Sequence, residues 1–172
     1  MNLQDSINEV KNENPLWKSN PKIIGRAGEK YCCKNMNCIK CNGFNWLECK
    51  TNKKSIDQIC KLCKKKYQIK CKNITEKKYT KIIKNKVFKT LGAEYKTTLD
   101  SIKENIDYII ILYNKKDYMI HGIIHIKSIN ITSDNIIPRK PLSKNAKRAG
   151  WQGCNLHFTK FNCIEQKHTK ND

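Results

Sequence analysis

The stretch DQICKLCKKKYQIKC, residues 57–71, carries the two signals that decide how this chain folds. The first is the spacing Cys60-Lys-Leu-Cys63, which repeats the spacing Cys38-Ile-Lys-Cys41 with eighteen residues between the two pairs. Two tight pairs of thiolates supply the four ligands of a closed tetrahedral zinc site. We therefore predict a structural Zn²⁺ ion with no open coordination position for catalysis.

The other cysteines leave alternatives for this site. One of Cys32, Cys33 and Cys49 could replace a ligand, whereas three further cysteines fit the role of small buried apolar side chains: Cys71, Cys154 and Cys163. Lysines adjoin both pairs and would favour the thiolate form by offsetting its negative charge. They are Lys40, Lys61, Lys64, Lys65 and Lys66.

The second signal is a possible catalytic cluster. Residues 67–71 alternate apolar and polar side chains, as a half-buried strand does. Folding the chain back around zinc would place residues 55–59 beside this strand, with Gln68 and Lys70 on one face and Asp57 close to both. Metal-dependent phosphodiester hydrolysis uses such a set, because oxygen ligands hold Mg²⁺ while a lysine orients or activates water. A solvated lysine-rich strand is the alternative.

Composition bounds the class of protein. The chain has 172 residues, the length of a single domain, and a formal net charge of +20, which favours a polyanionic partner such as nucleic acid. All but three of the 35 basic residues are lysines, so AT-rich coding accounts for part of this charge. No apolar run reaches the roughly 18 residues of a membrane span, and Met1 to Asn20 lacks an apolar signal core. We expect an intracellular protein that is neither secreted nor membrane-bound, with cysteines that bind metal rather than form disulfides.

Hydrophobic periodicity predicts the remaining elements. Apolar residues recur at helical spacing over 76–91 and leave lysines on the opposite face of an amphipathic helix. Five other segments are expected: an extended N-terminal arm (1–21), a helix (22–33), a hairpin of core strands (106–113 with 118–126), an irregular basic loop beyond Pro138, and a C-terminal tail (161–172).

Several motifs together resemble the catalytic domain of the DpnI, or Dam-replacing, family. They are the two cysteine pairs, Asp57 with Gln68-x-Lys70, and the stretches PRKPL (138–142) and AKRAGWQGCN (146–155). The resemblance covers about residues 22–157 and implies the PD-(D/E)XK fold, a mixed α/β sheet flanked by helices, with the zinc knuckle at 38–63 beside the active-site hairpin. We accordingly expect one nuclease domain over residues 22–160.

The resemblance also implies an activity, because the family uses Mg²⁺ to cut duplex DNA at GATC sites that carry 6-methyladenine. By position, Asp57 matches the metal-binding aspartate and Lys70 the catalytic lysine, and the zinc ligands are Cys38, Cys41, Cys60 and Cys63. Gln68 stands where the family has glutamate. Its amide oxygen can coordinate Mg²⁺ but lacks a negative charge, although other branches of the wider nuclease class use glutamine here. Glu29 could add a carboxylate, or it could be an exposed helix residue.

Trp151 matches a family tryptophan in the loop that senses methylated adenines. A planar aromatic side chain between glycines can approach base edges and contact methyl groups. Nearby basic residues would hold phosphates: Arg139, Lys140, Lys144, Lys147 and Arg148. A buried core tryptophan is the alternative.

Two departures from the family shape the functional expectation. The chain ends at Asp172, so we expect a catalytic domain without the C-terminal winged helix, the second module with which DpnI recognises methylated DNA. If Gln68 marks a lost metal site, the function would be that of a catalytically lapsed methylated-DNA-binding module.

An RNA-binding zinc ribbon is a third possibility. The oligomeric state of the protein on DNA is left open, with a monomer among the options.

Overall fold

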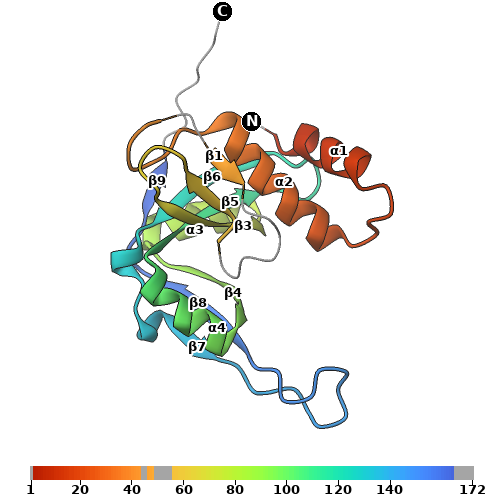
Figure 1. Cartoon of the computed structure of the whole chain (residues 1–172), viewed down its shortest axis with the longest axis vertical. Helices are drawn as coiled ribbons and strands as arrows, with labels where there is room; N and C mark the ends of the chain where they lie inside the picture. Colours follow the sequence, from red (N-terminus) through yellow and green to blue (C-terminus); the bar gives the residue numbers. More distant parts are fainter. Residues whose placement is uncertain (1, 44–45, 49–55, 165–172) are drawn as a thin grey trace, which may run out of the picture.

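Two β-sheets form the framework of the chain. The computed structural model describes residues 2–43, 46–48 and 56–164. In this part of the chain, a six-stranded sheet has the order β1-β2-β3-β5-β6-β9 and a three-stranded sheet has the order β4-β8-β7. Figure 1 shows α1 and α2 beside the large sheet, with α4 next to the small sheet. The protein therefore has a mixed α/β architecture.

The elements have the following bounds. The large sheet contains β1 (Trp46–Glu48), β2 (Gln58–Cys60), β3 (Lys66–Asn73), β5 (Ile106–Tyr113), β6 (Ile120–Ile126) and β9 (Asn162–Ile164). The small sheet contains β4 (Phe88–Glu94), β7 (Ile136–Pro138) and β8 (Gly153–Phe158). The helices are α1 (Gln4–Glu13), α2 (Asn20–Asn35), α3 (Glu76–Asn85) and α4 (Tyr95–Asp100), with short 3-10 turns at Ser101–Glu104, Ser128–Asn130 and Ser133–Asn135.

The large sheet is mixed, as predicted. Among the described strands only β3 and β5 pair in parallel, from Lys66 opposite Ile106 to Asn73 opposite Tyr113, and all other neighbours are antiparallel. Strand β5 is buried along its whole length. A continuous apolar run of this kind is typical of a central strand covered on both faces.

Alternation along the strands divides the interior into two cores. Ile69 and Ile109 belong to the core beneath α1 and α2. Tyr108 and Ile110 belong to the other core, which includes Leu156 of β8 and residues of α3. Because side chains alternate between faces, the even-numbered residues of β3 point to the side of the small sheet.

Three predicted elements are confirmed in type. The helix predicted over 22–33 is α2, and the predicted core hairpin is the antiparallel pair β5 and β6. The strand predicted over 67–71 is the central part of β3. In the part of the chain that the structure describes, no helix is long and apolar enough to cross a membrane.

The helix predicted over 76–91 is too long. Helix α3 ends at Asn85, because Lys86 adopts the left-handed conformation with φ of 51°. From Phe88 the chain continues as strand β4, in which buried and more exposed residues alternate. Leu91 has a helical spacing from Val87, but it lies on this strand and is exposed.

The N-terminal segment is not an extended arm. Residues 4–13 form α1, whose Ile7 and Val10 are buried against the first core. Lys30 of α2 bonds Glu9 at 3.2 Å and Glu13 at 2.9 Å. This helix has few apolar residues, and they are separated by polar ones. Their helical spacing is therefore a weak signal in the sequence.

The C-terminal third is also more regular than expected. Strand β8 begins at Gly153 within the segment predicted to be irregular, and it forms the centre of the small sheet. Strand β9 lies in the predicted tail and pairs with β6 through Ile124 and Cys163. Both strands depend on partners far away in sequence, which local patterns do not indicate.

Candidate metal centre and active site

The four cysteines of the two Cys-x-x-Cys pairs converge on one point. The Sγ atoms of Cys38, Cys41, Cys60 and Cys63 all lie within 4.8 Å of one another. Cys38 and Cys63 are 3.6 Å apart, and Cys41 and Cys60 are 3.5 Å apart. A tetrahedral site with Zn–S bonds of about 2.3 Å places its sulfurs roughly 3.8 Å apart. The cluster therefore has the ligands and the dimensions for one zinc ion.

Both cysteine turns have the same backbone geometry. The N–H of Asn42 donates to the carbonyl of Cys38 at 2.7 Å, and the N–H of Lys64 donates to the carbonyl of Cys60 at 3.0 Å. Asn42 and Lys64 are both left-handed, with φ of 57° and 59°. Each turn thus presents its first and second thiol toward the common centre.

The electrostatics of the cluster are consistent with a bound cation. Burial opposes ionisation of Cys60, but hydrogen bonds from the backbone of Cys63 and Leu62 and from the Cys41 thiol lower its pKa to about 7. Burial and the neighbouring thiols Cys38, Cys41 and Cys60 raise the pKa of Cys63 to about 12. Without a metal the four thiols cannot all ionise in so small a space, and Zn²⁺ is an ion that thiolates select.

Of the three alternative ligands, the two that the structure describes do not join this group. Cys32 and Cys33 lie on α2 outside it, and Cys49 lies outside the described residues. The prediction of a buried cysteine is confirmed for Cys154, which is inaccessible, whereas Cys71 is only partly buried, with its thiol packed against Gly28. The prediction is wrong for Cys163, which is exposed on the short edge strand β9.

Asp57 lies just before the hairpin of β2 and β3, whose turn carries Cys60 and Cys63. This hairpin, here called the zinc hairpin, brings Asp57 against β3. Its N–H donates to the carbonyl of Tyr67 at 2.9 Å, and its Oδ2 accepts the N–H of Ile69 at 2.6 Å. Ile69 is the residue between Gln68 and Lys70, so the carboxylate lies beside the strand that carries both. Burial raises the pKa of Asp57, while the Ile69 bond and the charges of Lys70 and Arg26 oppose the shift.

Gln68 and Lys70 share the face of β3 that is directed toward the small sheet. They lie opposite Tyr108 and Ile110 of β5, which belong to the second core. Burial lowers the pKa of Lys70, and electrostatic interaction with Asp57 opposes this shift. The structure thus places a carboxylate, an amide and a partly buried lysine along adjacent stretches of β3 and the segment before β2.

Trp151 lies in the long connection between β7 and β8. Its carbonyl accepts the N–H of Leu142 at 2.9 Å, and Gly150 is left-handed with φ of +74°. The Arg148 guanidinium lies 4.3 Å from the centre of the indole ring, and the indole packs over Gly153. Trp151 is half-buried, and the basic residues predicted to hold phosphates are exposed around it: Arg139, Lys140, Lys144, Lys147 and Arg148.

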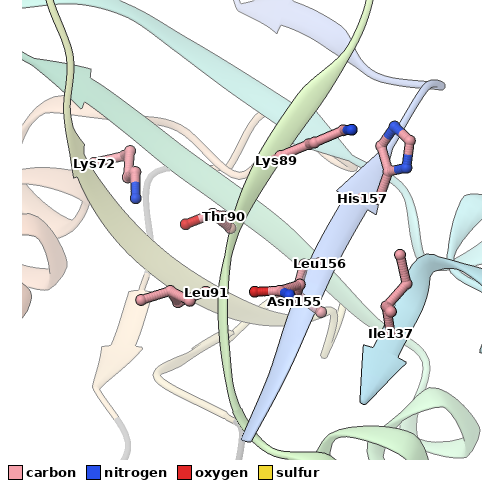
Figure 2. A pocket seen from close by; sticks show the side chains of 8 residues that line it. All are labelled: Lys72, Lys89, Thr90, Leu91, Ile137, Asn155, Leu156 and His157. Atoms are coloured by element: carbon pink, nitrogen blue, oxygen red, sulfur yellow. The ribbon is translucent and has the colours of Figure 1, made fainter. Parts of the chain in front are cut away.

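A cavity of about 360 Å³ opens where β3 meets the small sheet (Figure 2). Its walls include Lys72 of β3, Lys89 of β4, and Asn155 and His157 of β8. Lys72 lies two residues beyond Lys70 on the same face of β3. The cavity therefore begins next to the Asp57 and Lys70 cluster.

Comparison with known proteins identifies the family. A family model described as DpnI, Dam-replacing family, matches residues 3–165, nearly the whole chain. The chain belongs to the DpnI family. Membership indicates a DNA-binding protein and a nuclease related to methylation-dependent restriction. The match also extends beyond residues 22–157, because it includes α1 and β9.

Two residues near the DpnI-family site were missed from the sequence. The buried Gln58 donates through Nε2 to the carbonyl of Glu29 at 2.5 Å and to the Cys33 thiol at 2.9 Å, which ties β2 to α2. Arg26 acts on Asp57 electrostatically and bonds Glu29 at 2.6 Å. The Arg26-x-x-Glu29 spacing was a usable signal for this helix pair.

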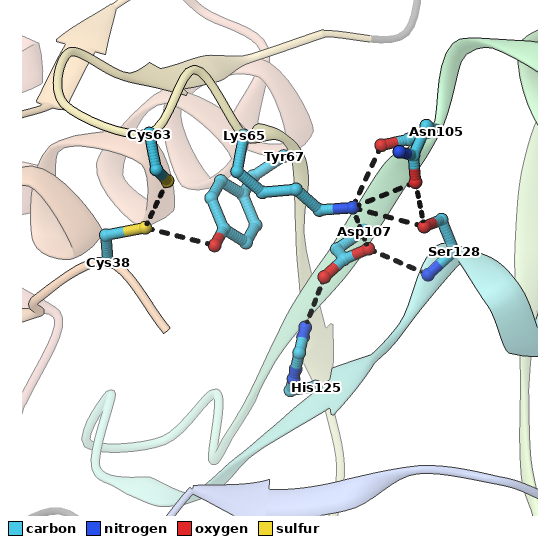
Figure 3. A network of polar contacts seen from close by, with 8 residues as sticks. All are labelled: Cys38, Cys63, Lys65, Tyr67, Asn105, Asp107, His125 and Ser128. Atoms are coloured by element: carbon cyan, nitrogen blue, oxygen red, sulfur yellow. Dashed lines mark hydrogen bonds and ion pairs between the residues drawn. The ribbon is translucent and has the colours of Figure 1, made fainter. Parts of the chain in front are cut away.

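A polar network anchors the zinc hairpin to β5 and β6 in this family member (Figure 3). Lys65 Nζ bonds Asp107 Oδ1 at 2.6 Å, and His125 Nε2 lies 2.8 Å from Asp107 Oδ2. The N–H of Ser128 donates to Asp107 Oδ1 at 2.7 Å. Burial opposes ionisation of Asp107, but His125, Lys65 and Ser128 together lower its pKa to about 2.

Asp107→Asn should destabilise the fold by about 2 kcal/mol at pH 7, since a pKa near 2 lies roughly two units below the unfolded value. A lowered pKa gives stability that is present above about pH 4 and lost as the pH falls toward 2. The difference between the two proteins should therefore shrink in acid. Urea unfolding at pH 7 and pH 3 measures it, with Asp134→Asn at an exposed position as control. Equal midpoints for the wild type and Asp107→Asn at pH 7 would contradict this account.

Proposed function

We propose that this chain is a Mg²⁺-dependent endonuclease of the PD-(D/E)XK class that hydrolyses duplex DNA at GATC sites containing 6-methyladenine. The observation that carries the proposal is the bond from Ile69 N–H to Asp57 Oδ2, which holds a carboxylate beside the strand of Gln68 and Lys70. Family membership supplies the substrate class. The mixed sheet, with the active-site hairpin next to a central parallel strand pair, is consistent with this nuclease class.

Asp57 and Gln68 are the residues that would hold the catalytic ion. Carboxylate and amide oxygens are hard ligands of the kind that Mg²⁺ prefers. When bound, the ion would polarise the scissile phosphate and help to generate the attacking hydroxide. The donor types fit Mg²⁺, although this pair carries one negative charge where an Asp and Glu pair carries two.

Lys70 would act directly on the reacting groups. The side chain is partly buried, which lowers the pKa of the ammonium, and a charge in such surroundings interacts more strongly with a phosphate than it would in bulk water. In this position the lysine orients the attacking water and stabilises the negative charge that develops on the phosphate oxygens. Glu29 has a smaller part, because its carboxylate is bonded to Arg26.

Trp151 and its basic neighbours would select the site. The loop is braced by backbone bonds and exposes Arg139, Lys140 and Lys147, which suits contacts to phosphates. The indole offers apolar contact area for the methyl groups of 6-methyladenine. Arg148 covers the ring in the free protein and would move to a phosphate on binding.

A cleavage assay tests the proposal. Zinc-loaded protein is incubated with Mg²⁺ and matched plasmids that are methylated or unmethylated at GATC. Linearisation of the methylated plasmid alone is the expected result. Binding of the methylated duplex without cleavage would instead support the second candidate, a catalytically lapsed methylated-DNA-binding module, which the neutral Gln68 favours.

Gln68→Glu should lower the Mg²⁺ concentration needed for half-maximal cleavage about tenfold, or about 1.4 kcal/mol of ion binding. The reason is that a second carboxylate adds negative charge at the ion. Cleavage rates over a Mg²⁺ titration measure the shift. Gln4→Glu on α1 makes the same charge change away from the site and should leave the titration unaltered. The assignment of Gln68 as a ligand fails if both variants behave like the wild type.

A further inference from the structure

We propose that the outer face of the small sheet is a docking surface for the phosphodiester backbone of duplex DNA. This inference rests on the proposed function and adds the path of the substrate beyond the cleavage site. The surface comprises five residues of the small sheet, Lys89, Leu91, Ile137, Asn155 and His157, together with Lys72 of the neighbouring strand β3, and all six line one cavity (Figure 2).

Strand alternation separates this surface from the core. Phe88 and Phe158 face each other across β4 and β8 and are buried in the second core. The next pair along, Lys89 and His157, must point the opposite way, since neighbouring residues of a strand alternate between faces. Figure 2 shows the Lys89 side chain extending toward His157 from the neighbouring strand.

A second row of side chains lies beside Lys89 and His157. Asn155 is opposite Leu91 on one side and Ile137 on the other, and all three are exposed. The two rows are about 7 Å apart, because two residues of an antiparallel strand span that distance. Amide and apolar groups next to a lysine suit the sugars and base edges that lie beside phosphates.

The charge of the cavity selects an anionic occupant. Of the eight described residues that line it, Lys72 and Lys89 carry positive charges and none is acidic. The chain as a whole has a net charge of +20, so its surroundings also repel cations. A phosphate backbone is a repeating anion and can contact both lysines along one strand.

The surface is continuous with both parts of the proposed site. Lys72 follows Lys70 on the same face of β3, so one end adjoins the position of the scissile phosphate. At the other end, Arg139 continues from β7, and its N–H bonds the carbonyl of Gly153 on β8 at 2.9 Å. A DNA strand on this face would therefore run from Lys70 toward the loop of Trp151.

The test measures binding apart from cleavage. The Kd of a GATC-methylated duplex is determined by fluorescence anisotropy over a NaCl series, with Ca²⁺ in place of Mg²⁺. We expect the double variant Lys72→Ala and Lys89→Ala to bind at least about tenfold more weakly at fixed salt. The log–log salt slope should fall by about 1.8, since each lost phosphate contact removes about 0.9. The control, Lys11→Ala with Lys18→Ala, removes two exposed charges at α1 and just after it, on the other side of the large sheet, and should keep the wild-type slope.

Each outcome decides between the two proposals. If the wild type cleaves and the Lys72 and Lys89 variant keeps the full slope, DNA docks elsewhere and this inference is overturned while the nuclease stands. If binding depends on both lysines but Mg²⁺ gives no cleavage, the docking surface stands and the nuclease fails. Absence of duplex binding at low salt contradicts both, and tighter Lys89-dependent binding of single-stranded RNA overturns the choice of duplex DNA.

Discussion

Lys70→Ala is expected to reduce the rate of DNA cleavage about 10³-fold while leaving duplex binding nearly unchanged. The substitution removes the partly buried ammonium that interacts electrostatically with Asp57. Removal of a group that assists proton transfer or stabilises transition-state charge typically lowers rates by about 10²- to 10⁴-fold. Single-turnover cleavage of a methylated duplex in Mg²⁺ gives the rate, and anisotropy in Ca²⁺ gives the binding.

The matched control for Lys70 lies on the same strand. Lys66 is also a lysine of β3, but its Nζ pairs with Glu104 at 2.7 Å near the surface. Such a pair contributes at most about 1 kcal/mol to stability, so Lys66→Ala should cleave at the wild-type rate. Equal losses in both variants would show that the strand tolerates no change and that Lys70 has no special role.

Cys60→Ser is expected to unfold the hairpin region and lower the Tm by more than about 10 °C. A structural zinc site contributes a large part of folding free energy, on the order of 10 kcal/mol in small zinc domains. About 1 kcal/mol corresponds to roughly 2–4 °C in a domain of this size class. Thermal unfolding by circular dichroism measures Tm, and elemental analysis should find one zinc per wild-type chain.

Cys163→Ser controls for the loss of a thiol as such. Cys163 is exposed on β9 and is outside the four-sulfur group. This variant should retain its zinc and its Tm. A purified wild type without zinc, together with an unchanged Tm in Cys60→Ser, would show that the cluster is not a metal site.

The four-cysteine cluster could be predicted because its signal is local. Two short turns with fixed Cys spacing determine the ligands, and their shared hydrogen bonds form within five residues of each cysteine. The pairing of 57–60 with 66–69 follows from the same turn. The position of Asp57 beside the strand of Lys70 could therefore also be predicted from the sequence. Helix α2 and the hairpin of β5 and β6 had strong periodic signals of their own.

The small sheet could not be predicted, because its strands come from three distant parts of the chain. Phe88 to Glu94 continues the apolar spacing of α3, and only the left-handed Lys86 ends that helix. The strand at 153–158 has a clear pattern only when its partners β4 and β7 are known. The proposed docking surface was hidden for the same reason, since Lys89 and His157 are 68 residues apart in sequence and are joined only by sheet register.

The parallel pairing of β3 with β5 has a consequence for the order of folding. Paired residues are 40 positions apart along the whole ladder, as in Lys70 opposite Ile110. Closing a loop of this length is entropically slower than forming the adjacent β5–β6 hairpin, so the hairpin should form early and the parallel pair late. Because Lys70 and its neighbours lie on the late strand, a partly folded chain would hold its hairpin before it holds any catalytic geometry. Activity during refolding should therefore appear only after the β5–β6 hairpin has formed.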